Sequence, residues 1–257
     1  MITIIVSKDR PAQLRLLLDS LQINGGNLFD ITVLYDYTDD LFLRGYTKTQ
    51  NHFYKKHMFS VNFPIKWKLR SSPNINEDIY KCTLQGRDLC CIFNDENILF
   101  DRVASYKLIK EMFKTYVLSS LSLRLGNNTV IQNPYEREGY FSPIPEEGTF
   151  VFDRFLLWNA TQVENYTNFA MPFSTNGHIY HKGVMACPEY SVSLHNSMIK
   201  LTETETSNLD ISIDTVNARY LKGNVIDYNA FDFTHVSKPY QDFTATFYNE
   251  DNLHNGS

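Results

Sequence analysis

The chain of 257 residues is 43% hydrophobic and carries a formal net charge of −5. That apolar fraction is enough to bury the core of one large or two small domains. The acidic balance, with a pI near 5.8, argues against a protein that binds nucleic acid through phosphate attraction. We therefore expect a globular protein that has no nucleic-acid partner.

The sequence carries no pattern of export or membrane insertion. No apolar run reaches the roughly eighteen residues of a membrane span, and the opening apolar segment is followed at once by Lys8, Asp9 and Arg10. The four cysteines lack C-x-x-C spacing, and Cys90 and Cys91 lie in an apolar run, where cysteine behaves as a small apolar residue. We expect no transmembrane segment and a reduced, cytoplasmic location; the oligomeric state stays open.

The first hundred residues alternate between strand and helix patterns. Leucines recur at i, i+3, i+4 and i+7 from Leu14, which predicts a helix that begins near Pro11 and ends at the Gly25–Gly26 pair. Pro64 places the strand around it at a sheet edge or a bulge. The expected strands cover 2–6, 31–35, 61–69 and 89–93, and the expected helices cover 11–25, 39–56 and 76–86. This alternation predicts an α/β protein with a Rossmann-like, mostly parallel sheet and right-handed crossovers.

Beyond residue 100 the pattern is less regular. A helix is expected over 103–116, followed by strands or strand candidates at 118–124, 149–153, 177–180 and 211–213. Segment 133–148 combines prolines, acidic residues and aromatics, which is typical of a surface loop beside a cleft. Neither an internal repeat nor a domain linker is present, so we expect a single domain.

The apolar run 89–93 stops abruptly at four polar residues, Asn94, Asp95, Glu96 and Asn97. In α/β sheets, ligands bind beyond the carboxyl ends of the strands. Asp95 and Asn97 are two residues apart and could direct oxygen atoms to one hard cation, which could in turn hold a phosphate. The alternative is that both side chains only close a turn. We favour a metal-assisted diphosphate site.

Motifs of other nucleotide chemistries are missing. Segment 7–11, Ser-Lys-Asp-Arg-Pro, follows the first strand where a dinucleotide-binding fold needs glycines that allow close approach. Neither G-x-x-x-x-G-K-[ST] nor G-x-S-x-G occurs, which argues against the P-loop ATPases and the serine hydrolases of the α/β-hydrolase type.

With these elements placed, the chain resembles the GT-A class of nucleotide-diphospho-sugar glycosyltransferases, in particular its small family-2-like members. The segments that carry the resemblance are 2–11, 32–36, 122–127, 172–180 and 217–227. The resemblance implies one GT-A-like domain over 1–257, a Rossmann-like sheet flanked by helices with a small antiparallel extension. It further implies a nucleotide-binding half at 1–118 and an acceptor half at 119–245, followed by a flexible tail at 246–257.

The resemblance places a short acidic D-x-D type motif at Asp95-Glu96-Asn97. It implies a bound Mn²⁺ or Mg²⁺ ion, because a divalent cation neutralises the charge that develops on the leaving nucleotide diphosphate. Asn97 stands at the third position of that motif, where an acidic residue is expected, so the second ligand could instead be Glu96. His178 is a further candidate ligand.

The second departure from the family concerns Asn176-Gly177-His178, where the family tends to have Asp-Gly-His. An amide cannot act as a general base, which leaves His178 to take the acceptor proton or to contact the diphosphate. The alternative is that His178 only hydrogen-bonds the backbone at a turn. Asp153, Glu146 and Glu147, on or near the aromatic segment, are other candidate bases.

Donor contacts are expected from the ends of several strands. Lys8 and Arg10 could touch the diphosphate, Tyr35 could stack on the base, and Asp36 could accept hydrogen bonds from the base or the ribose. Arg124 ends a strand and could pair with phosphate, or form an internal salt bridge instead. The full set of candidate donor-binding residues is Ser7, Lys8, Arg10, Tyr35, Asp36, Asn94 and Arg124.

These features together predict transfer of a sugar from a UDP- or GDP-sugar donor to a carbohydrate or other hydroxyl acceptor, with divalent metal assistance. One alternative is a sugar-nucleotide or glycan-binding module that kept the fold and lost catalysis, which Asn97 and Asn176 make credible. The other is a nucleotidyltransferase, which needs a similar metal-diphosphate site, although no Gly-rich loop with a following basic residue comes after the first strand.

Overall fold

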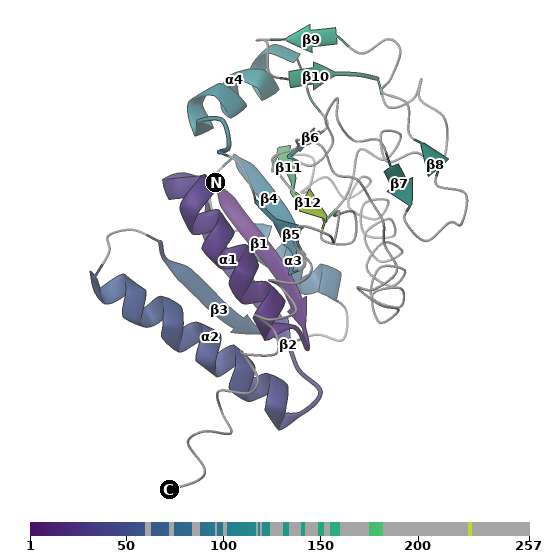
Figure 1. Ribbon diagram of the computed structural model, residues 1–257. Helices are drawn as coiled ribbons and strands as arrows, with labels where there is room; N and C mark the ends of the chain where they lie inside the picture. Colours follow the sequence, from purple (N-terminus) through teal and green to yellow (C-terminus); the bar gives the residue numbers. More distant parts are fainter. Residues whose placement is uncertain are drawn as a thin grey trace, which may run out of the picture.

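A six-stranded sheet lies at the centre of the computed structural model, with helices packed on both faces (Figure 1). The structure describes residues 1–59, 63–71, 75–83, 88–95, 97–99, 102–116, 118, 120–123, 131–133, 140–141, 149–151, 155–159, 175–181 and 226–227. Strand order in the sheet is β3-β2-β1-β4-β11-β6.

The bounds of the described elements follow the sequence pattern closely over the first hundred residues. The sheet consists of β1 (Ile2–Lys8), β2 (Asp30–Asp36), β3 (Ile65–Leu69), β4 (Leu89–Asn94), β6 (Ser120–Ser122) and β11 (His178–His181). The helices are α1 (Pro11–Gly25), η1 (Gly26–Leu28), α2 (Asp40–Phe59), α3 (Ile75–Thr83) and α4 (Tyr106–Tyr116). Three short antiparallel pairs join β5 (Asn97–Ile98) to β12 (Ile226–Asp227), β7 (Ile131–Asn133) to β8 (Tyr140–Phe141), and β9 (Thr149–Val151) to β10 (Phe155–Leu157).

Four neighbouring strands of the sheet are parallel. β1 pairs in parallel with β2 on one side and with β4 on the other, and β3 continues the parallel arrangement beyond β2. β11 is antiparallel to both of its neighbours, β4 and β6. The predicted α/β class, with a mostly parallel sheet and a small antiparallel part, is therefore confirmed, and the arrangement is consistent with a Rossmann-like GT-A fold.

Some sequence predictions differ from the structure in detail. β3 lies at the sheet edge, as Pro64 predicts, but begins at Ile65. The strand expected over 118–124 spans only Ser120–Ser122, and β7 pairs with β8 at 140–141, within the segment expected to be a loop. The strand candidate 211–213 and the tail 246–257 lie outside the described residues.

The core occupies both faces of the sheet because β1 alternates buried side chains between them. On one face, Ile5 packs in a cluster with the leucine stripe of α1 and with Tyr46 and Phe53 of α2. On the other face, Ile4 packs with Ile79 of α3. The leucine stripe predicted to be core consists of Leu14, Leu17, Leu18 and Leu21, all of which are fully buried. Helices on opposite faces are what right-handed crossovers predict, because the chain moves from β1 to β3 in one direction across the sheet and returns to β4 in the other.

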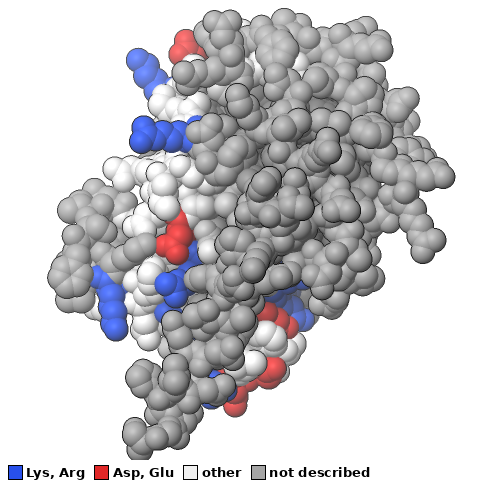
Figure 2. Space-filling view, in the orientation of Figure 1, with Lys and Arg blue, Asp and Glu red and all other residues white. Residues whose placement is uncertain are grey.

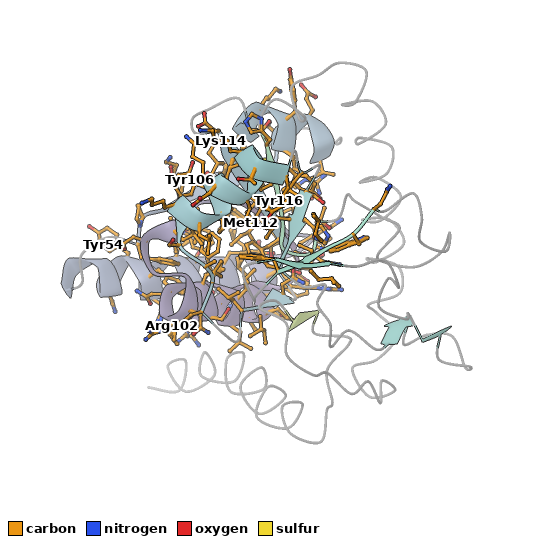
Figure 3. All side chains as sticks on the ribbon, turned by 90° about the horizontal axis from the view of Figure 1, so that it is seen from above. Tyr54, Arg102, Tyr106, Met112, Lys114 and Tyr116 are labelled. Carbon is orange, nitrogen blue, oxygen red and sulfur yellow. The ribbon has the colours of Figure 1, made fainter. Side chains whose placement is uncertain are left out.

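Along α4, Met112 is buried against the core whereas Lys114 is exposed, as its amphipathic pattern requires (Figure 3). Cys90 and Cys91 on β4 are buried free thiols, which confirms that they act as small apolar residues. None of the helices in the described part of the chain has the length and apolar character required to span a bilayer.

The end of α1 depends on a close approach between Gly25 and Phe29. Gly25 has ordinary helical backbone angles, but a Cβ atom on this residue would overlap the ring of Phe29. That ring is buried and packs edge-on against Phe93 at a centroid distance of 5.8 Å, so it has little room to move. Gly26 follows with a φ of +53°, which only glycine adopts readily.

The substitution Gly25→Ala should lower the free energy of unfolding by about 1–2 kcal/mol, because overpacking against Phe29 outweighs the better helix propensity of alanine. Urea unfolding of wild type and variant measures the difference. A variant that is more stable than wild type would contradict the close approach.

Candidate functional site

The sheet changes its direction of winding at β1. The chain passes from β1 through α1 to β2 on one side, and later returns to place β4 on the other side of β1. Val6 lies opposite Asn94 in the register, and the Asp95 N–H donates to the Val6 carbonyl at 3.1 Å. Open α/β sheets bind ligands at such a switch point, beyond the carboxyl ends of the strands. The residues that follow β1 and β4 therefore meet where a ligand is expected.

Asp95 is the buried acidic group of this switch point, with 5% of its surface exposed. Its carboxylate accepts hydrogen bonds from the Ser7 side chain and the Lys8 N–H, and its Oδ1 lies 3.9 Å from Arg10 Nη1. Burial raises the pKa of Asp95 from 3.8 to about 6, although Arg10 and the hydrogen bonds oppose that shift. The protein thus compensates only part of the cost of burying this charge.

Tyr46 of α2 connects the helix to the loop that follows β1. Its hydroxyl lies 2.7 Å from Ser7 Oγ and accepts a hydrogen bond from the Arg10 N–H at 3.3 Å. Because Ser7 donates to the ionised Asp95, which can only accept, Tyr46 must donate to Ser7. Burial, followed by the charge of Asp95, raises the pKa of Tyr46, so the phenol stays neutral.

Sequence analysis did not identify Tyr46. A signal was present, because Phe42, Tyr46, Thr49 and Phe53 follow one helix face and Tyr46 is close to the amino end of α2. Helices that follow parallel strands begin at the carboxyl edge of the sheet, so a polar tip near this end of the buried face points toward the site.

The end of β2 lies at the same edge of the sheet. The Tyr35 ring packs 5.0 Å from the Tyr46 ring and edge-on to Trp67 at 6.2 Å, which places Trp67 in the core cluster. Asp36 accepts a hydrogen bond from the Tyr37 N–H at 2.9 Å and pairs with Arg70 Nη1 at 3.5 Å. The predicted donor residues Tyr35 and Asp36 are therefore held on the expected edge, and their contacts with a donor stay predictions.

The loops after β1 and β2 are tied to each other by Asp9. This residue has a φ of +57°, its N–H donates to the Asp36 carbonyl at 3.3 Å, and its Oδ1 accepts from the Thr38 N–H at 2.7 Å. Such a constraint keeps the exposed Lys8 and the half-buried Arg10 on the carboxyl edge.

Three buried asparagines form an amide cluster at the ends of β4 and β11. Asn97 Oδ1 accepts the backbone N–H of Asn94 at 3.0 Å, and its Nδ2 donates to Asn176 Oδ1 at 3.3 Å. Asn94 Nδ2 donates to the same Asn176 oxygen at 2.9 Å. The Asn97 oxygen thus closes a turn, as one of the two interpretations of this motif predicts. Its role as a metal ligand stays a prediction.

His178 begins β11 opposite Ile92 and is buried. Its Nδ1 lies 3.3 Å from the Asn176 carbonyl oxygen, and its ring stacks on Tyr180 at 6.3 Å. Ile92 and Tyr180 belong to the core on the α3 face, whereas Asp95 contacts Ser7 and the α1–α2 face. His178 and Asp95 both lie near the carboxyl end of β4, and the role of His178 as a metal ligand stays a prediction.

Gly177 allows the close packing that places Asn176 in the cluster. It has a φ of +68°, and its N–H donates to the Ile92 carbonyl at 2.8 Å. Beside it, the buried Thr175 Oγ1 has no hydrogen-bond partner among the described residues. Sequence analysis did not identify Thr175.

Several predicted site residues lie outside the described residues. These are Glu96, Arg124, Glu146, Glu147 and Asp153. Within the described part of the chain, no group of three or more His, Cys, Asp or Glu side chains is arranged to hold a metal ion. Asp95 is the carboxylate that the described part of the chain places at the switch point.

Comparisons with known proteins concern the overall structure. No protein-family model matches the chain, and no curated protein matches it. Solved structures with similarity include the glycosyltransferase GlyE of Streptococcus pneumoniae TIGR4, at 10% identity and a TM-score of 0.41, over 97% of this chain and 62% of that chain. The chain thus spans less than two thirds of GlyE.

Two further similar structures are a 4-diphosphocytidyl-2C-methyl-D-erythritol synthase from Anaerococcus prevotii DSM 20548 and mouse xyloside xylosyltransferase 1 in its apo form. The first has 10% identity and a TM-score of 0.36, over 95% of each chain. The second has 8% identity and a TM-score of 0.36, over 93% of this chain and 83% of that chain. Identities this low do not assign a function, so the functional argument has to come from the residues of the site.

The raised pKa of Asp95 predicts a pH-dependent effect of the isosteric substitution Asp95→Asn. Between about pH 4 and pH 6 the folded state binds more protons than the unfolded state, so the stability of the wild type falls as pH rises. D95N removes this loss. Its free energy of unfolding should exceed that of the wild type by at most roughly 3 kcal/mol at pH 8 and should equal it near pH 4. Urea unfolding across this range tests it, and a difference independent of pH would contradict it.

The hydroxyl of Tyr46 should contribute to stability through Ser7 and Arg10. Tyr46→Phe leaves the buried Ser7 hydroxyl and the partly buried Arg10 N–H without this partner and should lower the free energy of unfolding by about 1–3 kcal/mol. Tyr54→Phe, on the exposed side of the same helix, is the matched control and should have no effect. Equal stability of the two variants in urea unfolding would show that the Tyr46 hydrogen bonds are not significant.

Proposed function

We propose that the chain is a glycosyltransferase that moves a sugar from a UDP- or GDP-sugar to a hydroxyl acceptor with divalent metal assistance. The observation that carries the proposal is the buried Asp95 carboxylate at the switch point between β1 and β4, beside Ser7 and Arg10. A carboxylate next to basic groups suits a nucleotide diphosphate that carries a metal ion, because the carboxylate can bind the cation while the basic groups bind the phosphates.

The chemistry of Asp95 fits a divalent ion. Mg²⁺ and similar hard cations are commonly held by one or two protein carboxylates together with phosphate oxygens of the substrate. Burial raises the pKa of Asp95 despite Arg10, so a further positive charge nearby would stabilise the ionised carboxylate. When bound, the ion would offset the negative charge that develops on the leaving nucleotide diphosphate.

Positive groups at the same edge support binding of the diphosphate. Arg10 carries a planar set of donors suited to phosphate oxygens, and Lys8 is exposed at the end of β1. α1 begins at Pro11, directly after these residues, so the positive end of its dipole lies at this edge.

The nucleoside would lie toward β2. Asp36 can accept hydrogen bonds from the base or the ribose, and Tyr35 supplies an aromatic surface that the core holds in place. Trp67 of the edge strand β3 packs edge-on against Tyr35 and helps to hold that ring in place.

His178 is the candidate base among the described residues. A proton on Nδ1 can be donated to the Asn176 carbonyl, which leaves Nε2 as the basic atom of the ring. In the transfer, the acceptor oxygen bonds to the anomeric carbon, the bond from that carbon to the diphosphate breaks, and the base takes the acceptor proton. Asp153 remains the alternative base.

The amide cluster favours a second candidate, a sugar-nucleotide or glycan-binding module without catalysis. Asn97 and Asn176 stand where the resemblance expects carboxylates, and their amides are hydrogen-bonded to each other in the buried cluster. Neutral groups used in this way can hold the strand ends without acting as ligands or bases.

Binding of UDP- and GDP-sugars, measured by isothermal titration with and without Mn²⁺, tests the proposal. Wild type should bind at least about tenfold more tightly with the ion, and D95N should lose this increment because it lacks the charged ligand. Asp30→Asn is the matched control, since Asp30 begins β2 at the opposite edge of the sheet and should not affect binding.

Release of the nucleoside diphosphate separates the two candidates. Turnover with an added acceptor, or slow hydrolysis without one, supports the transferase. Metal-dependent binding without any release supports the binding module. If D95N and D30N bind as wild type does, the proposed site is wrong.

A further inference from the structure

A basic groove lies between α1 and α2, on their solvent-facing side. The groove is shallow and open, with a volume of about 550 Å³, and its charged lining consists of Arg15 of α1 and of Arg44, Lys48, His52 and Lys55 of α2. We call these five residues the basic groove. Figure 2 shows both basic and acidic side chains at the lower left, where Figure 1 places α2.

The charge of the groove contrasts with that of the whole chain. The chain has a net charge of −5, yet α2 contains no acidic residue after Asp40. The acidic neighbour is Asp19 of α1, which lies 3.9 Å from Arg15 Nε and 3.6 Å from His52 Nε2. Among the described residues, Arg44 and Lys55 have no acidic partner, so the groove keeps a positive charge.

The helix geometry gathers these charges along one line. Arg44, Lys48 and Lys55 are separated by four and seven residues and therefore share one face of α2. The distance from Arg44 to Lys55 along the axis is about 16 Å. Between them, the exposed Thr47 and Asn51 also line the groove and add neutral polar groups.

The groove is separate from the proposed nucleotide site. Tyr46 and Phe53 lie on the opposite, buried face of α2, where Tyr46 bonds to Ser7. Arg44 and Tyr46 are two residues apart, so their side chains leave the helix in different directions. A ligand in the groove would leave the carboxyl edge of the sheet open.

The chemistry of the groove selects anionic oxygen. Arg44 offers planar donors for two oxygens of one phosphate, whereas Lys48 and Lys55 act as point charges. Cations distributed over this length match several anionic groups better than one. We propose that the basic groove binds a ligand that carries two or more phosphate groups, either a soluble oligophosphate or clustered phospholipid headgroups.

Inorganic tripolyphosphate is the first probe, titrated calorimetrically into the full chain at low salt. Wild type should bind, with an affinity that falls as salt is added. R44Q/K48Q should weaken binding about tenfold or more, since it removes two charges of the groove. K107Q/K114Q removes two exposed charges from α4 and should bind as wild type does.

Vesicles of phosphatidylcholine with phosphatidylglycerol are the second probe, followed by co-sedimentation. If R44Q/K48Q loses vesicle binding that K107Q/K114Q keeps, and tripolyphosphate does not bind, the phosphates are those of a lipid surface. Thermal unfolding checks that the variants fold, and K55Q provides an independent variant of the groove.

The proposal is overturned if neither probe binds, or if R44Q/K48Q and K107Q/K114Q bind both probes equally. It is also overturned if a single-stranded oligonucleotide binds while both probes fail, because that result would assign the groove to nucleic acid. R44Q/K48Q should bind UDP-sugars as tightly as the wild type does, whatever the result with the two probes. This control shows that the groove and the nucleotide site are separate.

Discussion

The pairing of β1 with β2 on one side and β4 on the other is the constraint on which the rest of the structure depends. A strand that is hydrogen-bonded along both edges and buried on both faces needs a helix layer on each side. The leucine stripe of α1 covers one face and α3 covers the other. Because the winding reverses at β1, the ends of β1 and β4 form the crevice, and the residues after these strands become the site.

The same pairing explains the electrostatics of Asp95. Its N–H extends the ladder to Val6, so its side chain starts inside the sheet layer rather than in solvent. Ser7 and Lys8 end the partner strand β1, Arg10 follows it, and all three reach the carboxylate. They supply hydrogen bonds and one cation, but desolvation remains the largest influence on its pKa. Among the described residues, the groups around Asp95 therefore offset only part of the desolvation of its charge, so a bound cation would stabilise the ionised carboxylate further.

Much of the fold and part of the site follow from local sequence patterns. Apolar spacing predicts α1, and the apolar run before Asn94 predicts β4 and its polar end. The hydrogen bonds of Asn176 to Asn94 and Asn97 span 82 and 79 residues, and depend on how β11 inserts between β4 and β6. No local pattern encodes that register. Tyr46 differs, because its place on the buried face near the amino end of α2 is a local signal, whereas its hydrogen bond to Ser7 depends on how α2 packs over the end of β1.

The amide cluster limits how charge can be distributed at the strand ends. Asn176 Oδ1 accepts two N–H donors in a buried setting, and Asn97 closes the turn that carries Asp95. A carboxylate at either position would add a second buried negative charge near Asp95, whose own charge Arg10 offsets among the described residues. With amides, the turn is fixed by hydrogen bonds that do not depend on pH or on a bound cation. These hydrogen bonds hold the turn without a bound ligand. Asp95 is then the residue of this turn whose charge a bound cation would stabilise.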